Sequence, residues 1–215
     1  MFNVNIDVTY IIIVIVVVFA SMVLHELMHG LMALWLGDTT AKENGRLTLN
    51  PLKHIDPFLT LLLPVILAIF HMPIFGGAKP VPFRPDRVKG GEWGAALVGA
   101  AGPLTNLVLA FLSFALVVWI NPGGVFGQIL TTGVYVNLGF FAFNILPIPP
   151  LDGSRVLYAI APEYVRRGME FIEHMGLMVI FVIVLILSKP LGFVLGAIID
   201  FFIKMFAAIF GVQIV

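Results

Sequence analysis

The chain has 215 residues, of which 60 % are hydrophobic and only 11 % are charged, and its mean hydropathy is +1.06. A soluble domain of this length carries roughly twice that charged fraction, so the composition excludes a soluble globular protein and indicates one integral membrane domain over residues 1–215. The formal net charge is zero and no basic run is present, which argues against a nucleic-acid partner. Cysteine is absent, so disulfides, a thiol nucleophile and thiolate metal ligands are excluded as well.

Long apolar helices dominate the predicted secondary structure. Each approaches the roughly 20 residues that cross a bilayer as a helix. The first ten residues lack the positively charged region of a cleavable signal peptide, so we expect the first helix to be retained. The five helices are predicted at about 8–36, 93–120, 128–147, 168–187 and 190–211.

A shorter apolar segment, 58–70 (FLTLLLPVILAIF), lies between the first two helices. Its length suits a re-entrant element better than a span. If it re-enters, ten of the Lys and Arg residues share one face and only Lys189 lies opposite, whereas a full crossing divides them seven to four. The positive-inside rule favours the first arrangement. We therefore predict an all-α polytopic protein of the cell membrane with five transmembrane helices plus a re-entrant segment, the alternative being six. In the favoured arrangement the N-terminus is outside and the C-terminus is cytoplasmic.

Two loops carry local signals. The alternating residues 46–50 (RLTLN) predict a short β-strand or hairpin at the membrane surface. The Gly- and Pro-rich residues 76–85 (GGAKPVPFRP) predict irregular backbone, which at membrane depth is tolerated only against protein or water. Small residues between Gly94 and Gly102 are expected to permit close helix packing.

The stretch VLHELMHG (23–30) places two histidines and a glutamate at the end of an apolar helix. Ionisable groups at that depth are costly and indicate a functional site. His25 and His29 are four residues apart and share a helical face, so both imidazoles can bind one metal ion. Glu26 projects beside them, where it can take a proton from water. This is the His-Glu-x-x-His pattern of zinc hydrolases, and it predicts one Zn²⁺ per chain.

A catalytic zinc usually takes three protein ligands and keeps one open position. Asp152, in FNILPIPPLDGSR (143–155), is the best candidate for the third ligand, because prolines break the helix before it. The predicted topology brings Asp152 and the histidines to the same, cytoplasmic, side. The rise along the first helix places the metal near the cytoplasmic edge of the hydrocarbon core. The remaining histidines are His54, His71 and His174.

Three motifs in this order resemble the site-2 protease family of intramembrane zinc metalloproteases: HELMHG (25–30), AGPLTN (101–106) and FNILPIPPLDG (143–153). The resemblance covers about residues 10–160. It implies a catalytic core of about 8–160, with accessory helices over 168–211. The similarity is to small members without a PDZ or CBS domain.

The resemblance implies a role for each matching residue. His25, His29 and Asp152 would be the zinc ligands, and Glu26 the general base. Asn144 would bind the substrate backbone or stabilise the oxyanion, with Asn106 as a further substrate-binding residue. The implied reaction is hydrolysis of peptide bonds within or near transmembrane segments of membrane proteins, in contact with the lipid bilayer.

The physical demands of such a reaction agree with several features of the sequence. A transmembrane helix protects its own carbonyls by internal hydrogen bonds, so the substrate must unwind locally before attack. The predicted strand at 46–50 could then pair with the extended substrate segment, and Asn144 could bind its freed amide groups.

Other functions fit less well. A metal-ion transporter could use the His/Glu/Asp cluster as a transit site, but residues 11–19 offer no polar path and residues 121–127 are uncharged. A catalytically inactive scaffold would not need Glu26. The chain also lacks a Gly-x-Ser-x-Gly elbow and a second well-placed intramembrane aspartate, which argues against serine and aspartyl proteases.

Overall fold

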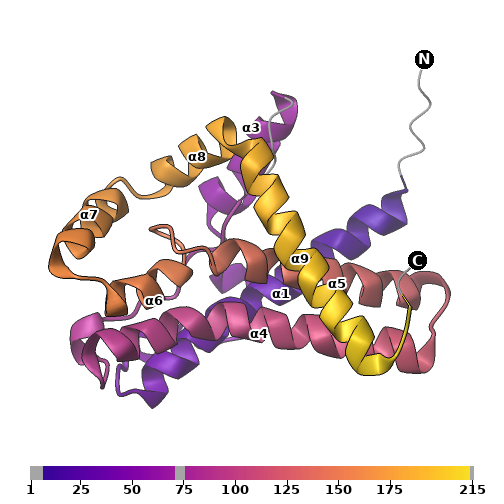
Figure 1. The fold of residues 1–215 in the computed structure, drawn as a ribbon, viewed down its shortest axis with the longest axis horizontal. Helices are drawn as coiled ribbons and strands as arrows, with labels where there is room; N and C mark the ends of the chain where they lie inside the picture. The colour runs from indigo at the N-terminus through magenta and orange to yellow at the C-terminus, as the bar shows by residue number, and fades with distance from the viewer. Residues whose placement is uncertain (1–6, 71–75, 214–215) are drawn as a thin grey trace.

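The computed structural model describes residues 7–70 and 76–213, and every regular element in those residues is a helix (Figure 1). The predicted all-α fold is therefore confirmed for this part of the chain. Four of the helices described there are long and apolar enough to cross a membrane. These are α1 (Val8–Trp35), α4 (Gly91–Ile120), α5 (Gly124–Asn144) and α9 (Ser188–Phe210). The shorter α-helices are α2 (Thr40–Glu43), α3 (Leu63–Ile69), α6 (Gly153–Ile160), α7 (Glu163–His174) and α8 (Leu177–Ile186).

Helices α1, α4 and α5 pack side by side, with α1 and α5 running in one direction and α4 in the other (Figure 1). Asp7 begins α1 as its N-cap, since its carboxylate accepts hydrogen bonds from the backbone of Thr9 and Tyr10 at 3.0 and 3.2 Å. Residues 121–123 join α4 to α5 in a tight connection. We name the end of the bundle at this connection the Asn121 end. The opposite end, where α1 and α5 terminate, is the Asp152 end.

The outer surface of this bundle is apolar and flanked by tryptophans. Trp93 and Trp119 lie exposed near the two ends of α4. They are 26 residues apart, which is about 39 Å of helix. That length matches a bilayer with its headgroups, where tryptophan is enriched at both interfaces. The protein is therefore a multi-pass membrane protein.

The short apolar segment folds as a π-helix over Pro57–Leu62 that continues into α3. Beyond α3 the described chain resumes at Gly76, and Gly77 already lies beside the start of the same segment. The Gly77 N–H donates to the Leu59 carbonyl at 3.2 Å, and the Thr60 hydroxyl donates to the Gly77 carbonyl at 2.6 Å. The chain after the segment therefore lies beside the residues at which the segment begins.

The strand predicted at 46–50 is not formed in this structure. His54 Nε2 donates to the Thr48 carbonyl at 2.9 Å, and the Thr48 hydroxyl accepts from the Asn50 N–H at 3.1 Å. The guanidinium of Arg46 donates to the Lys79 carbonyl at 2.6 Å. Side chains thus take up backbone groups that a strand would pair in a ladder, so the alternating pattern does not lead to a hairpin.

The single helix predicted over 168–187 is wrong, because the chain bends by 92° between α7 and α8. Gly176 lies at the bend with φ 59°, a conformation that favours glycine. Helix α7 carries charged residues, and the ten residues of α8 rise only about 15 Å, roughly half a hydrocarbon core. A fifth span exists only if this bent pair is counted as one.

Helix α9 crosses over α4 and α5 and ends at the Asn121 end (Figure 1). Its Phe206 is only 1 % exposed and packs with Ala110, Val134 and Leu138. Phe210 contacts Trp119 with ring centroids 5.6 Å apart. Because α1 begins at this same end, both described ends of the chain lie at the Asn121 end, whereas the sequence analysis expects the termini on opposite sides of the membrane. The number of crossings depends on whether the bent pair α7 and α8 crosses the membrane.

Candidate metal centre

The three predicted ligands converge at the Asp152 end. His25 Nε2 lies 3.0 Å from His29 Nε2 and 3.1 Å from Asp152 Oδ2, and His29 Nε2 lies 3.4 Å from the same oxygen. The side chains of His25 and His29 keep 9 and 10 % of their surface accessible, whereas the Asp152 side chain keeps 25 %. The site is therefore enclosed on the α1 side and open beside the carboxylate.

A sharp reversal of the chain after α5 brings Asp152 to this position. Helix α5 ends at Asn144, before the proline-rich turn, and α6 begins at Gly153. A Cβ on Gly153 would lie 2.2 Å from the Ile145 carbonyl oxygen, so only glycine permits this close return. Sterics therefore explain why glycine follows Asp152, because glycine at position 153 allows the chain reversal that directs Asp152 toward α1.

The donor chemistry of the three residues fits a cation. His29 Nδ1 lies 2.6 Å from the Val98 carbonyl, which can only accept, so this nitrogen carries the proton and Nε2 keeps its lone pair. His25 Nδ1 lies 2.6 Å from Asn106 Oδ1, which leaves Nε2 free in the same way. Two imidazole lone pairs and a carboxylate oxygen therefore face one another. Ligands on a tetrahedral zinc, with bonds of about 2.0–2.1 Å, stand about 3.3 Å apart, close to the observed spacing.

Gly102 of α4 closes the site from behind the histidines. A Cβ there would lie 2.3 Å from His29 Nε2 and 2.7 Å from His25 Nε2. Contacts this short do not occur between real atoms, so the backbone of α4 approaches the two imidazole Nε2 atoms at a distance that glycine alone allows. The small residues of α4 were expected to permit helix packing, and here that packing defines one wall of the metal centre.

Glu26 follows His25 in the chain but is not part of the group of three predicted ligands. Its Oε2 accepts a hydrogen bond from the Val81 backbone at 2.8 Å. Val81 stands between Pro80 and Pro82, which have no N–H, so it is the one backbone donor of this tripeptide. Oε1 of Glu26 has no hydrogen-bond partner in the part of the chain that the structure describes. One carboxylate oxygen is therefore held and the other is free.

The extended segment that carries Val81 is anchored on both sides. The Lys79 N–H donates to the His54 carbonyl at 2.8 Å, in addition to the Arg46 contact with the Lys79 carbonyl. The Arg84 N–H donates to Asp38 Oδ2 at 2.6 Å, and Asp38 is fully buried. The segment therefore holds Val81 against Glu26 from two fixed points.

The two predicted substrate-binding asparagines have different surroundings. Asn106 is fully buried, with Oδ1 on His25 and Nδ2 donating to Asn137 Oδ1 at 2.8 Å. Asn144 is partly exposed at the end of α5 and donates only to the Phe140 carbonyl of its own helix, at 3.0 Å. The sequence analysis missed Asn137. Its signal was available, since a lone asparagine in the apolar run of α5 is a costly group at membrane depth.

The other histidines do not join the site. His54 is fully buried against Thr48, and His174 Nδ1 lies 2.6 Å from the Glu170 carbonyl. His71 is outside the described residues. Over the ranges 7–70 and 76–213, His25, His29 and Asp152 form the one group of three side chains able to hold a metal ion.

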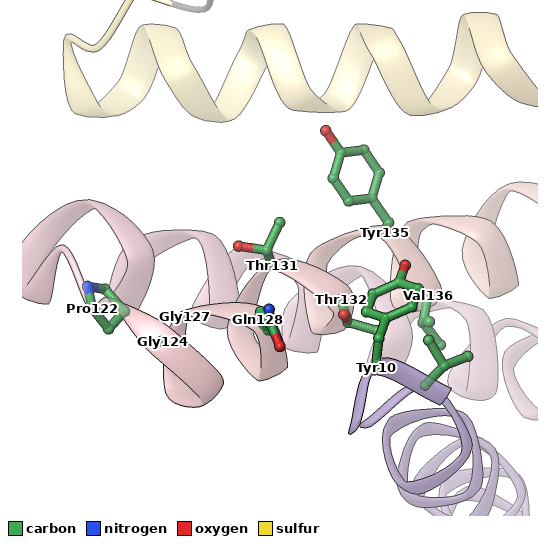
Figure 2. Close-up of a pocket in the computed structure, with 10 residues that line it drawn as sticks. Tyr10, Pro122, Gly124, Gly127, Gln128, Thr131, Thr132, Tyr135 and Val136 are labelled. Atoms are coloured by element: carbon green, nitrogen blue, oxygen red, sulfur yellow. The ribbon is translucent and has the colours of Figure 1, made fainter. Parts of the chain in front are cut away.

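A cavity of about 650 Å³ opens at the Asn121 end, between the start of α1 and the first half of α5 (Figure 2). It is separate from the metal centre, because Val14 in its wall and His25 are eleven residues apart on α1, about 16 Å. Its lining contains no Asp, Glu, His or Cys, so it lacks the usual side chains for metal binding. They are Tyr10, Val14, Pro122, Gly124, Gly127, Gln128, Thr131, Thr132, Tyr135 and Val136.

Comparison with known proteins gives consistent matches. Residues 123–187 match the family model described as Peptidase family M50. YwhC of Bacillus subtilis, named as a zinc metalloprotease, is 38 % identical over 210 residues, 91 % of each chain. Rip2 of Mycolicibacterium smegmatis, also named as a zinc metalloprotease, is 33 % identical over 80 % of this chain and 65 % of its own. MJ0611 of Methanocaldococcus jannaschii, with the same kind of name, is 32 % identical over 71 % of this chain and 73 % of its own. No solved structure matches the chain.

Proposed function

The chain belongs to peptidase family M50, and from this premise we propose that His25, His29 and Asp152 hold one zinc ion, with Glu26 as general base. The protein is an intramembrane zinc metalloprotease. The observation that carries the assignment of residues is the convergence of two imidazole nitrogens and one carboxylate oxygen, spaced 3.0–3.4 Å apart, at one buried point.

Zinc bound at this point supplies Lewis acidity, which polarises the scissile carbonyl and promotes ionisation of water. Glu26 takes the proton of the attacking water and delivers it to the leaving amide nitrogen. Because the Val81 N–H holds Oε2, the carboxylate presents Oε1 to the water in a fixed orientation. Substrate enters from the accessible side, beside Asp152.

The substrate in this proposal is a transmembrane segment of another protein. Its peptide bonds are protected while it remains helical, so it must unwind at the site. Asn144 is partly exposed and has one side-chain hydrogen bond to its own helix, which it can exchange for the substrate backbone. Asn106 is engaged at both polar atoms, so we assign the substrate contact to Asn144 alone. His29 lies six residues before Trp35, about 9 Å of helix, so cleavage falls near one membrane face.

We further propose four spans, α1, α4, α5 and α9, with segment 57–69 re-entrant and the Asp152 end in the cytoplasm. The return of Gly77 to Leu59 supports re-entry. Leu191, near the start of α9, packs against the cluster of Leu151, Ile180 and Val184, which puts nearby Lys189 at the Asp152 end with the ten Lys and Arg residues between positions 42 and 167. Lys204 of α9 is then the one cation elsewhere, and the positive-inside rule places this end in the cytoplasm of the cell membrane.

The absence of cysteine makes this topology directly testable. Single substitutions Asn44→Cys, Asn121→Cys and Gln213→Cys are labelled in intact cells with a membrane-impermeant maleimide. We expect labelling at positions 121 and 213 and protection at 44. Protection at 213 together with labelling at 121 would instead support five spans.

The enzymatic proposal is tested with purified protein added to solubilised membranes from cells that lack this chain. Mass spectrometry then counts new peptide termini within transmembrane segments. Glu26→Gln should retain one zinc per chain and lower cleavage by about 10²–10⁴-fold, the usual contribution of a general base. Thr131→Ala, at the separate cavity, is the matched control and should cleave normally. An active Glu26→Gln variant would contradict the assignment of the base.

The transporter alternative is not favoured. Residues 14–24 of α1, between the cavity and the histidines, contain no ionisable group to pass a cation onward. Flux of Zn²⁺ into proteoliposomes that persists in Glu26→Gln would revive that alternative.

A further inference from the structure

We propose that Asn106 and Asn137 are positioning residues that form a relay from a backbone carbonyl of α5 to the ligand His25 and set its tautomer. The inference rests on the proposed zinc site but concerns groups that do not touch the metal or the substrate. Under this proposal, the two buried asparagines, one on α4 and one on α5, act together to orient His25.

The relay consists of three consecutive hydrogen bonds inside the bundle. His25 Nδ1 and Asn106 Oδ1 are 2.6 Å apart, Asn106 Nδ2 and Asn137 Oδ1 are 2.8 Å apart, and Asn137 Nδ2 and the Gly133 carbonyl are 2.8 Å apart. Asn106 is 0 % and Asn137 is 4 % exposed. Water does not compete for these groups, so each must be satisfied by its neighbour.

The Gly133 carbonyl decides the direction of every bond in the relay. A carbonyl only accepts, so the group of Asn137 facing it must be the amide nitrogen. Its oxygen then faces Asn106, which must present its own nitrogen there and its own oxygen to His25. Since that oxygen accepts, His25 Nδ1 carries the proton and Nε2 keeps the lone pair that binds metal.

The same tautomer of the two histidines is thus set in different ways, directly by a carbonyl for His29 and through intervening side chains for His25. His29 donates directly to the Val98 carbonyl at 2.6 Å, whereas His25 depends on two intervening carboxamides. Metal-binding histidines usually donate their second N–H to a carboxylate, a carbonyl or water. A carboxamide pair provides this contact without adding a charge inside a membrane-spanning bundle, where an unpaired charge is costly.

The relay predicts that a residue without contact to the metal controls metal affinity. In Asn137→Leu, the side chain of Asn106 can rotate and turn its nitrogen toward His25, which favours the tautomer that cannot bind zinc through Nε2. We expect a 10–100-fold weaker zinc affinity, the usual effect of losing an outer partner. Affinity is measured with Zn²⁺ and a chromogenic chelator in competition, and the absorption spectrum of the Co²⁺-loaded protein reports on ligand geometry. Thr132→Val, a buried polar group on the same helix outside the relay, is the matched control and should bind zinc normally.

A conservative replacement separates the relay from simple packing. In Asn106→Asp, either carboxylate oxygen accepts from His25, so the orientation no longer depends on Asn137. The other carboxylate oxygen faces Asn137 Oδ1, and two acceptors repel, so zinc affinity is compared within the Asn106→Asp background, where adding Asn137→Leu should cause no further loss. A packing role predicts the same loss from Asn137→Leu in both backgrounds, and that result would overturn the proposal.

The native protein provides a test that needs no relay variant to fold. With ¹⁵N-histidine labelling of the metal-free chain, the His25 signals, assigned by their loss in His25→Asn, should show the proton on Nδ1. A His25 ring that carries no proton on Nδ1 would overturn the proposal. Both readouts are independent of proteolysis, so a protein that cleaves nothing but shows them would refute the enzymatic proposal and leave the relay standing.

Discussion

The two ends of the α1/α4/α5 bundle differ in how their polar side chains are buried and hydrogen-bonded. At the Asp152 end, polar side chains are buried and directed onto one another, so that three lone pairs meet. At the Asn121 end, the cavity has more room, and its polar side chains, such as Gln128, Thr131 and Tyr135, are exposed and have no hydrogen-bond partner among the described residues. The volume of a cavity therefore does not locate the chemistry. The convergence of donor atoms that can bind a metal ion locates the chemistry instead.

The largest difference between the ends should appear when a ligand is removed. Asp152→Ala takes away the one carboxylate of the metal centre and leaves the two imidazoles to bind alone. We expect zinc content after dialysis to fall from one per chain to near zero, and cleavage to be lost with it. Elemental analysis measures this, and Asp86→Ala, an exposed carboxylate, is the control. Full zinc occupancy in Asp152→Ala would break the comparison.

A single methyl group at the back of the metal centre should have the next largest effect. Gly102→Ala forces a Cβ within 2.3 Å of His29 Nε2, and overpacking of this kind costs about 1–3 kcal/mol. Zinc affinity should fall by about 5–150-fold. Gly139→Ala on α5 is the matched control, since a Cβ there meets nothing within 4 Å. Equal effects of the two substitutions would show that α4 does not shape the site.

Asp38 tests how firmly the Asp152 end is anchored from its loops. Burial raises the pKa of this carboxyl, but hydrogen bonds from Thr40 and the Arg84 backbone outweigh it, so the pKa lies below its usual value. The stabilisation is therefore present above the unfolded-state pKa of about 3.9 and is lost as the pH falls below it. Asp38→Asn should lower the free energy of unfolding by about 1.5–3 kcal/mol at pH 7 and flatten its decline in acid. Unfolding in detergent between pH 3 and 7 measures both, and an unchanged acid profile would contradict the role.

The smallest effects are expected at the cavity. Thr131→Ala and Tyr135→Phe remove polar groups that have no hydrogen-bond partner in the described chain. The free energy of unfolding should change by less than about 0.5 kcal/mol and zinc affinity should not change. A loss of zinc from either variant would show that the two ends are coupled.

The candidate site was largely predictable, because its residues are unusual where they occur. His25, Glu26 and His29 stand out within an apolar helix, and Asp152 follows prolines that must end one. The structure brings His25, His29 and Asp152 together as that pattern implied. Asn137 was missed although its position in α5 is just as unusual, because a lone asparagine carries no motif. Gly102 was noticed for its size alone, since its distance from two histidines is a property of helix packing.

The topology of the C-terminal third was predicted less well. Residues 168–187 look like one apolar helix, yet the chain bends at Gly176 and the last helix ends at the Asn121 end. The strand at 46–50 failed for a related reason. The backbone of this segment bonds to side chains, namely those of His54 and Thr48, instead of to a second strand.

The sequence alone determines a helical membrane protein in which two histidines share one helical face, with a glutamate between them in the chain. Hydropathy over twenty residues and a spacing of four on a helix are local quantities that need no knowledge of the fold. Tertiary structure alone decided that a carboxylate 127 residues away from His25 completes the site and that Val81 holds Glu26. It also decided that a carbonyl on α5 orients a ligand on α1. These relations depend on how closely α1, α4 and α5 approach, and that distance is set by the packing of whole helices.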